Sequence, residues 1–184
     1  GIAVIFQEPA TRFNPMMTVG DQVAEIIRTH LTCGRTEARA RAVEWLRRVS
    51  IPRPEEAYDA YPHELSGGLK QRAMIAMALS ADPKVVVADE PTTALDVTVA
   101  RQVLQVLNDL KRERGLTLIF MTHDLALLPG IADCVALMYA GEIVEMAPTE
   151  AFLAHPEHPY AQALLGALPR PCLLYTCPST RDST

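Results

Sequence analysis

The chain has 184 residues, 49% hydrophobic and 21% charged, which is an ordinary composition for one globular domain with a real core. Its formal net charge of −5 argues against a broad nucleic-acid-binding face, and its apolar runs are too short to cross a membrane. Four scattered cysteines without a C-x-x-C pair indicate neither a zinc site nor a disulfide framework, so a reduced, cytosolic protein is predicted.

The first 80 residues predict one strand followed by a helical insert. Residues 2–6 form a short apolar, β-branched run typical of a buried strand, and a proline-containing loop follows it. The helical period and capping residues predict three helices: one that Thr18 caps, one at 36–49 and one at 66–80. Several prolines at 51–64 predict a linker with a short helix between the last two. The insert therefore covers residues 14–80.

The rest of the chain alternates between strands and helices. Apolar runs predict a buried strand at 85–88 and another strand at 116–121, on either side of a helix at 96–114 with helical apolar spacing. Shorter elements are predicted as a helix at 124–131, a hairpin of 135–139 and 142–145, and helical pieces at 149–154 and 160–168. The alternation predicts an α/β fold with a largely parallel sheet.

Polar side chains follow three of the predicted strands. They are Gln7 after the first strand, the pair Asp89 and Glu90 after the second, and His123 after the third. Ligands of open parallel α/β sheets lie at the carboxyl ends of the strands, so these side chains are expected to meet there. One carboxylate of the pair can face Mg²⁺ while the other activates a water. Taken alone, Asp-Glu before Pro91 is more typical of a solvated turn.

A second group of residues stands at the predicted start of the helix at 66–80. Ser66, Gly67 and Gly68 leave backbone N–H groups unshielded at the positive end of the helix dipole, where anions bind readily. An ordinary N-cap uses the same residue types, so both interpretations stay open for this short run.

Five segments in a fixed order make the chain resemble ABC-type ATPases. Residues 65–72 (LSGGLKQR) resemble the ABC signature, and residues 85–90 (VVVADE) resemble a Walker B strand. Residues 94–96 (ALD) resemble the D-loop, Gln7 the Q-loop glutamine, and residues 121–124 (MTHD) the switch-histidine region. Each segment is modest by itself, whereas the ordered set is specific.

Further segments resemble one branch of that family, the oligopeptide/dipeptide importers, which also includes nickel and glutathione importers. They are residues 7–9 (QEP), 61–64 (YPHE), 138–141 (MYAG) and 158–160 (HPY). The implied fold is a P-loop NTPase-like ABC ATPase domain. Its implied parts are a partial ATPase core at 1–13 and 81–147, a helical subdomain at 14–80, a C-terminal helical extension at 148–171, and a tail at 172–184.

The resemblance also implies catalytic roles at the strand ends. Glu90 is implied to be the general base for the attacking water, and His123 to contact the γ-phosphate of ATP. Asp89 and Gln7 are implied to hold Mg²⁺, and Gln7 also to take part in catalysis and to signal to the permease. Catalysis of this kind consists mostly of positioning and charge stabilisation.

Other implied roles involve partners. Ser66, Gly67, Gly68 and Gln71 are implied to bind ATP held by a second ABC ATPase subunit in a head-to-tail dimer, and Asp96 to link the two sites. Transmembrane permease subunits and, indirectly, an extracytoplasmic solute-binding protein are implied, and no nucleic acid. The implied location is peripheral, on the cytoplasmic face of the cell (inner) membrane.

One motif of the family is absent from these residues. No G-x-x-x-x-G-K-[ST] sequence occurs, and in this family that loop lies upstream of the Q-loop, where it would precede Gly1. The start inside an apolar run indicates a fragment, which is expected to bind and hydrolyse ATP poorly. The tail from about Cys172 resembles translated sequencing adapter and is expected to be non-native.

Two other functions stay open, and side chains outside the motifs are assigned to packing. A non-transport ABC protein acting on DNA or in translation is disfavoured, because residues 8–64 hold no sustained heptads and no basic linker is seen. A fragment without activity of its own is the other alternative. Trp45, Met74, Met77 and Met121 are predicted to fill the core.

Overall fold

The computed structural model describes residues 1–8, 11–93 and 95–167, so the predictions for Ala94 and for the tail at 172–184 lie outside the described residues. Its contacts divide the chain into two compact units, Gly1–Asp124 and Leu125–Thr184. Among the helices of the described part, none combines the length and apolar character that a membrane span needs. The domain boundaries predicted from the sequence were drawn from motifs, whereas these two units are defined by contacts, so the predicted boundaries remain a prediction.

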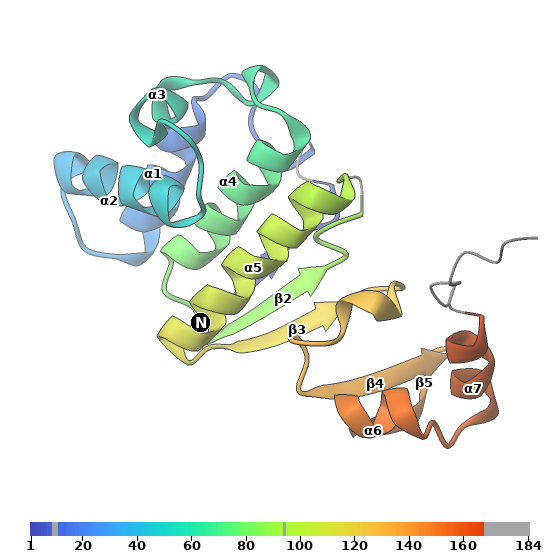
Figure 1. Ribbon diagram of the computed structural model, residues 1–184. Coiled ribbons are helices and arrows are strands. Elements are labelled where there is room, and N and C mark those ends of the chain that lie inside the picture. The colour runs from blue at the N-terminus through green and yellow to red at the C-terminus, as the bar shows by residue number, and fades with distance from the viewer. Residues whose placement is uncertain (9–10, 94, 168–184) are drawn as a thin grey trace, which may run out of the picture. The chain divides into compact units, whose positions relative to one another are not determined.

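A three-stranded parallel sheet underlies the first unit (Figure 1). Its strands are β1 (Ile2–Ile5), β2 (Val85–Asp89) and β3 (Thr117–Met121), in the order β1-β2-β3. The parallel register places Ile5 beside Ala88, and Asp89 beside Met121. The predicted α/β fold with a parallel sheet is therefore confirmed, and all three strands end at one edge.

Only one face of this sheet is buried. Ile5, Val86 and Ala88 are fully buried, because they point to the face that packs on the helices. The opposite face carries four exposed apolar side chains, Ile2, Val4, Ile119 and Met121, and the half-buried Val85 and Val87. The strands predicted to be buried at 2–6 and 85–88 are thus buried on one face only, and the core position predicted for Met121, which is 42% exposed, is wrong.

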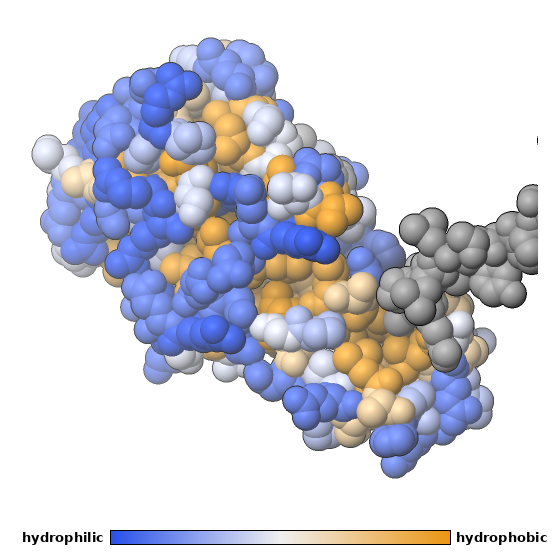
Figure 2. Space-filling view, viewed as in Figure 1, coloured by the Kyte–Doolittle hydropathy of each residue, from blue (hydrophilic) through white to orange (hydrophobic). Residues whose placement is uncertain are grey.

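The segment between β1 and β2 is helical, as the sequence predicts. Its elements are α1 (Val19–His30), α2 (Arg35–Arg48), α3 (Pro54–Asp59), the 3-10 turn η2 (Pro62–Glu64) and α4 (Gly67–Ser80). Thr18 caps α1 as expected, since its hydroxyl accepts a hydrogen bond from the Asp21 N–H at 3.2 Å. Figure 2 shows mostly hydrophilic side chains over the visible surface of α1 to α3.

Helix α4 is the central element of the core. It contacts β1, α1, α2 and α5 (Val97–Arg114), and Ile75 and Leu79 on it are among the largest fully buried side chains. Met74 and Trp45 belong to the same core as predicted, with Met77 partly buried against it. Helix α5 ends at Gly115, whose φ of 61° is the left-handed conformation that favours glycine at this position.

The second unit is a hairpin with two short helices. Strands β4 (Cys134–Tyr139) and β5 (Glu142–Pro148) pair antiparallel, and α6 (Thr149–Ala154) and α7 (Pro159–Gly166) follow. Its small core contains Val135, Leu137 and Phe152. The hairpin is thus confirmed, with β5 longer than predicted.

The helix predicted at 124–131 is wrong. Only the 3-10 turn η3 (Leu125–Leu127) forms there. Two residues explain the early end. Pro129 lacks a backbone donor and disfavours helical geometry in the residue before it, and Gly130 has a φ of 82°.

Candidate active site

Glu90 is the centre of a hydrogen-bonded cluster just beyond the ends of the three strands. Gln7 Nε2 donates to Glu90 Oε2 at 2.9 Å, and Thr93 Oγ1 donates to the same oxygen at 2.7 Å. His123 Nδ1 lies 2.8 Å from Glu90 Oε1. The structure therefore brings together Gln7, Glu90 and His123, which follow β1, β2 and β3. Sequence reasoning did not single out Thr93.

The backbone around Glu90 explains how its side chain reaches this cluster. Glu90 has a φ of 43°, in the left-handed region that residues with a Cβ rarely adopt. Its N–H donates to the Met121 carbonyl at 3.0 Å, and its own carbonyl accepts from the Thr93 N–H at 3.2 Å. The strand pairing and the following turn together hold Glu90 in this conformation. Such outliers concentrate at functional sites.

The contacts of Glu90 change the acidity of both members of the His123–Glu90 pair. Hydrogen bonds from His123 and then from Thr93 lower the pKa of Glu90, because both stabilise the carboxylate. The same contact with Glu90 raises the pKa of His123, because it stabilises the imidazolium. The His123 side chain is 73% exposed, so solvent screens the pair.

A pH titration tests this pair. We expect His123 to titrate above the value of about 6.5 of a free imidazole, and Glu90→Gln to lower its pKa. The raised pKa means that the contribution of His123 to stability is complete below about 6.5 and is lost as the pH rises through the folded value. The lowered pKa of Glu90 means that its contribution is complete above about 4.3 and is lost as the pH falls through its folded value.

The measurement is NMR of the His123 ring protons across this pH range. The control is Glu25→Gln, which neutralises an exposed carboxylate on α1 and should leave the His123 pKa unchanged. An unchanged pKa in Glu90→Gln would contradict the contact.

Asp89 is the last residue of β2, next to Glu90, and it is half-buried. The described residues contain no cluster of three or more His, Cys, Asp or Glu side chains that could hold a metal by themselves. The donor set nevertheless suits Mg²⁺, which is usually bound by one or two carboxylates together with phosphate oxygens and waters. Asp89 supplies one carboxylate for such a site, directly before Glu90 in the chain.

The predicted anion site at the start of α4 lies on a different element. Ser66 Oγ accepts from the Leu69 N–H at 3.4 Å and so caps α4, while Asp96 Oδ1 accepts from the Val99 N–H at 3.0 Å and caps α5. No hydrogen bond described for these residues joins them to the Glu90 cluster. Gln71 is only 1% exposed, and its Nε2 has no partner within the described part of the chain. The burial of Gln71 does not support its predicted contact with a nucleotide.

Gly68 has a packing role that the motif alone does not reveal. A Cβ added at Gly68 would lie 2.5 Å from Val99 Cγ1 on α5, whereas one at Gly67 would meet nothing within 4 Å. The absence of a side chain at Gly68 therefore lets α4 lie directly against α5.

This close approach leads to a prediction with a built-in control. We expect Gly68→Ala to lower the free energy of unfolding by about 1–3 kcal/mol, the usual cost of overpacking. Gly67→Ala should be neutral or slightly stabilising, because alanine is the better helix former. Urea denaturation of both variants measures the difference, and adding Val99→Ala should restore stability to Gly68→Ala. Equal effects of the two glycine substitutions would exclude the packing role.

Comparison with known families identifies two matching regions. The model of the family described as "ABC transporter" matches residues 1–93, and that of "Oligopeptide/dipeptide transporter, C-terminal region" matches residues 144–176. The second match reaches into the segment that the sequence predicts to be non-native.

Similar proteins are much longer than this chain. The glutathione import ATP-binding protein GsiA of Escherichia coli (strain K12) is 50% identical over 169 residues, which are 92% of this chain and 27% of GsiA. The oligopeptide transport ATP-binding protein OppD of Bacillus subtilis (strain 168) is 48% identical over 168 residues, which are 91% of this chain and 47% of OppD. The chain thus spans less than half the length of either relative.

Solved structures show the same fold. The ATP-binding cassette MJ0796, a dimer in a post-hydrolysis state bound to ADP and Pi, superposes with a TM-score of 0.71 at 29% identity. The match covers 80% of this chain and 62% of that one. A second dimeric structure of MJ0796, described as a bacterial ABC transporter cassette, superposes with a TM-score of 0.70.

Proposed function

The chain belongs to the ABC transporter family, and from this we propose that it forms part of an ATP-hydrolysing subunit that energises the import of peptides. The observation that carries the proposal is the cluster of Gln7, Glu90 and His123 at the carboxyl edge of the sheet. Both relatives are named for peptide cargo, since glutathione is itself a tripeptide. The C-terminal region typical of oligopeptide and dipeptide transporters supports the same substrate class.

Glu90 has the geometry of a general base. A carboxylate offers about four lone-pair sites, and the three contacts from Gln7, Thr93 and His123 leave one for a water. With its pKa lowered, Glu90 is ionised near neutral pH, which a general base requires, although the hydrogen bonds that lower the pKa also make it a weaker proton acceptor. Gln7 lies beside the same carboxylate and can orient the attacking water by its amide.

His123 and Asp89 complete the proposed site. The raised pKa of His123 favours an imidazolium, whose charge suits the γ-phosphate of ATP. Asp89 and Gln7 would hold Mg²⁺, which when bound neutralises the charge that develops on the phosphate oxygens. These residues would position the water and stabilise charge, which are the main contributions of a protein to phosphoryl transfer.

The proposal includes a second ATPase subunit. Ser66, Gly67 and Gly68 present the N-terminus of the 14-residue helix α4, where backbone N–H groups favour a phosphate. We propose that they contact ATP held by the partner subunit in a head-to-tail dimer, with Asp96 at the junction. The two structures of MJ0796, which has a similar fold, are dimeric, and this supports a second subunit.

The remaining parts of the proposal concern the assembly. The 14–80 segment would be the helical subdomain, 1–13 with 81–147 the partial ATPase core, and 148–171 a C-terminal extension. Transmembrane permease subunits would hold the protein at the cytoplasmic face of the membrane, and a solute-binding protein would deliver the peptide. Homodimers, heterodimers and a tandem parent chain all fit these features.

ATP binding and hydrolysis test the proposal in two steps. The 184 residues contain no G-x-x-x-x-G-K-[ST] sequence, so the chain by itself should show no saturable binding in a Mg-ATP titration at micromolar concentrations. A chimera that joins the preceding segment of Bacillus subtilis OppD to Gly1 should bind and hydrolyse ATP. Tight binding by the chain alone would overturn the first expectation, and binding without hydrolysis by the chimera would overturn the second.

A further inference from the structure

A pocket of about 480 Å³ lies in the first unit beside α4 and α5, two helices that contact each other (Figure 1). It is lined by Arg72 of α4, by Ser50 in the loop after α2, and by residues of α5 that include Arg101, Gln102 and Asp109. Neither the Glu90 cluster nor the 66–68 start of α4 contributes to this lining. Its volume is within the usual range of small-molecule sites.

Arg72 is a buried cation whose hydrogen-bond partners are both neutral. The residue is only 9% exposed, and its Nη1 donates to the Ser50 carbonyl at 2.7 Å while its Nη2 donates to Gln102 Oε1. Its Nε is buried without a partner, and no ion pair within the described part of the chain involves it. Buried charges in proteins are normally paired. The guanidinium of Arg72 therefore lacks a counter-charge, which a bound anion would supply.

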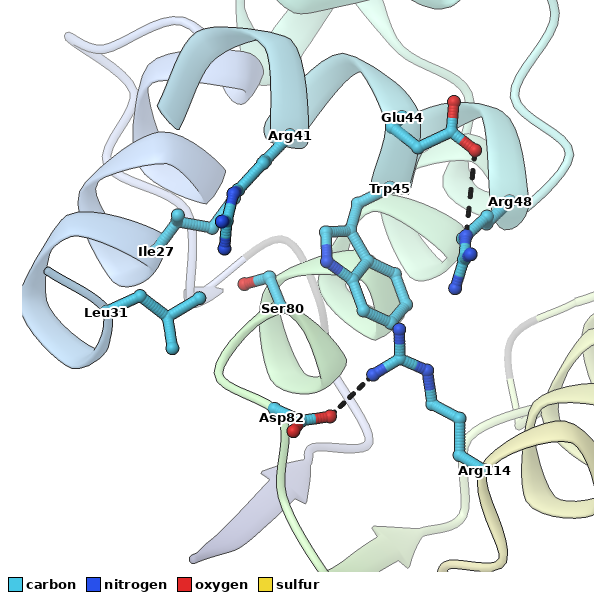
Figure 3. A pocket seen from close by; sticks show the side chains of 9 residues that line it. All are labelled: Ile27, Leu31, Arg41, Glu44, Trp45, Arg48, Ser80, Asp82 and Arg114. Atoms are coloured by element: carbon cyan, nitrogen blue, oxygen red, sulfur yellow. Dashed lines mark hydrogen bonds and ion pairs between the residues drawn. The ribbon is translucent and has the colours of Figure 1, made fainter. Parts of the chain in front are cut away.

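The arginines of another pocket, at the C-terminal end of α5, show the usual arrangement (Figure 3). Arg114 pairs there with Asp82 at 2.6 Å, and Arg48 lies 3.6 Å from a carboxylate oxygen of Glu44. The positive charges of that pocket are thus balanced by carboxylates of the chain itself. Arg72 differs from these arginines because it is more buried and because its partners carry no charge.

Arg101 adds a second cation to the pocket of Arg72. Its side chain is exposed, and it makes no ion pair or hydrogen bond with any residue that the structure describes. The neighbouring Gln102 accepts from Arg72 through its amide oxygen, which leaves its Nε2 as a further donor. Two cations and an amide donor therefore line the same part of the pocket.

The carboxylate among the lining residues, Asp109, is remote from this group of donors. It follows Gln102 on α5 by about two helical turns, which is roughly 10 Å. Its two carboxylate oxygens accept from Gln105 Nε2 at 3.0 and 3.2 Å. Because the guanidinium of Arg72 contacts Gln102, Asp109 is too far along the helix to pair with it.

We propose that the part of this pocket formed by Arg72, Arg101 and Gln102 binds a phosphate group. A phosphate monoester carries about 1.5 to 2 negative charges near pH 7, which matches the two guanidinium groups, and its oxygens can accept from donors on both helices. A carboxylate has one charge and would balance only one of the cations. This chemistry has two sources, inorganic phosphate and the phosphate monoester of a small molecule. The site is independent of the ATP hydrolysis proposed above, because it shares no residue with the Glu90 cluster.

Isothermal calorimetry on the 184-residue chain tests the site near neutral pH, with chloride used to keep the ionic strength constant. The probes are inorganic phosphate, glycerol 3-phosphate and acetate. We expect saturable binding of phosphate with a Kd on the order of 1 mM, the affinity expected for so few atoms. Acetate should bind at least about tenfold more weakly, because it makes fewer charge-assisted hydrogen bonds.

Two variants locate the binding without the loss of stability that a substitution of Arg72 would cause. Arg101→Met should weaken phosphate binding about tenfold, whereas Arg112→Met, which removes an exposed arginine of α5 outside the pocket, should leave it unchanged. Gln102→Glu places a carboxylate beside Arg72 and so supplies the counter-charge within the chain. It should also weaken phosphate binding at least about tenfold. Far-UV circular dichroism checks that all three variants are folded.

Each outcome either supports or overturns the proposal. If glycerol 3-phosphate binds at least as tightly as inorganic phosphate, the pocket is a site for phosphate monoesters; if it binds more weakly, the pocket is a site for the free ion. Both results support the proposal. Equal affinities for acetate and phosphate, an unchanged affinity in Arg101→Met or Gln102→Glu, or no saturable heat with phosphate overturns it.

Discussion

Replacing Glu90 by glutamine (Glu90→Gln) in the chimera with the OppD segment is expected to slow ATP hydrolysis about 10²–10⁴-fold, the usual contribution of a general base. Glutamine keeps the shape of the side chain but accepts no proton from water at neutral pH. ATP binding should survive, because the glutamine oxygen can still accept hydrogen bonds from Gln7 and Thr93, and Glu90 is proposed to contact the attacking water rather than ATP itself. Phosphate release measures the rate, and a filter assay measures bound ATP.

The matched control for this prediction is Glu25→Gln, which removes a carboxylate from the exposed face of α1. Its rate should equal that of the unaltered chimera. If Glu90→Gln retained the full rate, Glu90 would not be the base, and the cluster would be a solvated turn stabilised by hydrogen bonds.

Replacing Arg72 by methionine (Arg72→Met) is expected to lower the free energy of unfolding by about 3 kcal/mol. Arg72 on α4 is 9% exposed, and its Nη1 donates to the Ser50 carbonyl at 2.7 Å while its Nη2 donates to Gln102 Oε1. Hydrogen bonds to a charged group contribute about 1.5–3 kcal/mol each, and relief of guanidinium desolvation offsets part of their loss. Methionine keeps the length of the stem but leaves both oxygens without this donor.

Arg72 joins α4 to the loop after α2 and to α5, so the substitution removes hydrogen bonds between three segments of the first unit. Urea denaturation at constant pH measures the loss. Arg101→Met removes an exposed arginine from α5 and should change stability by less than about 0.5 kcal/mol. Arg72→Lys should fall between the two, since lysine keeps the charge but not the fork. Equal stabilities of Arg72→Met and Arg101→Met would disprove the role of these contacts.

The fold class, and the edge of the sheet at which polar side chains gather, could both be predicted from the amino-acid sequence. Short β-branched runs separated by helical periods require a parallel sheet, and parallel strands end at a common edge. Gln7 and Glu90 could therefore be placed together across 83 residues of sequence, and His123 with them. The helix caps at Thr18 and Gly115 were equally predictable, because capping depends on residues close in the chain.

The side chains that complete the cluster around Glu90 could be identified only from the folded chain. Thr93 reaches Glu90 because Glu90 adopts a positive φ, a conformation that no local propensity predicts for glutamate. The exposure of Met121 could not be predicted, since a strand covered on one face and a strand covered on both can have the same apolar run.

Contacts between helices could not be predicted from the sequence either. Gly68 lies against Val99, and Arg114 stacks on Trp45, across 31 and 69 residues of chain. A motif describes the order of residue types along the chain. Packing depends on which faces of two helices lie against each other, and this is established only when the core folds. The candidate catalytic edge could thus be predicted from local patterns, whereas these contacts between helices were visible only in the folded chain.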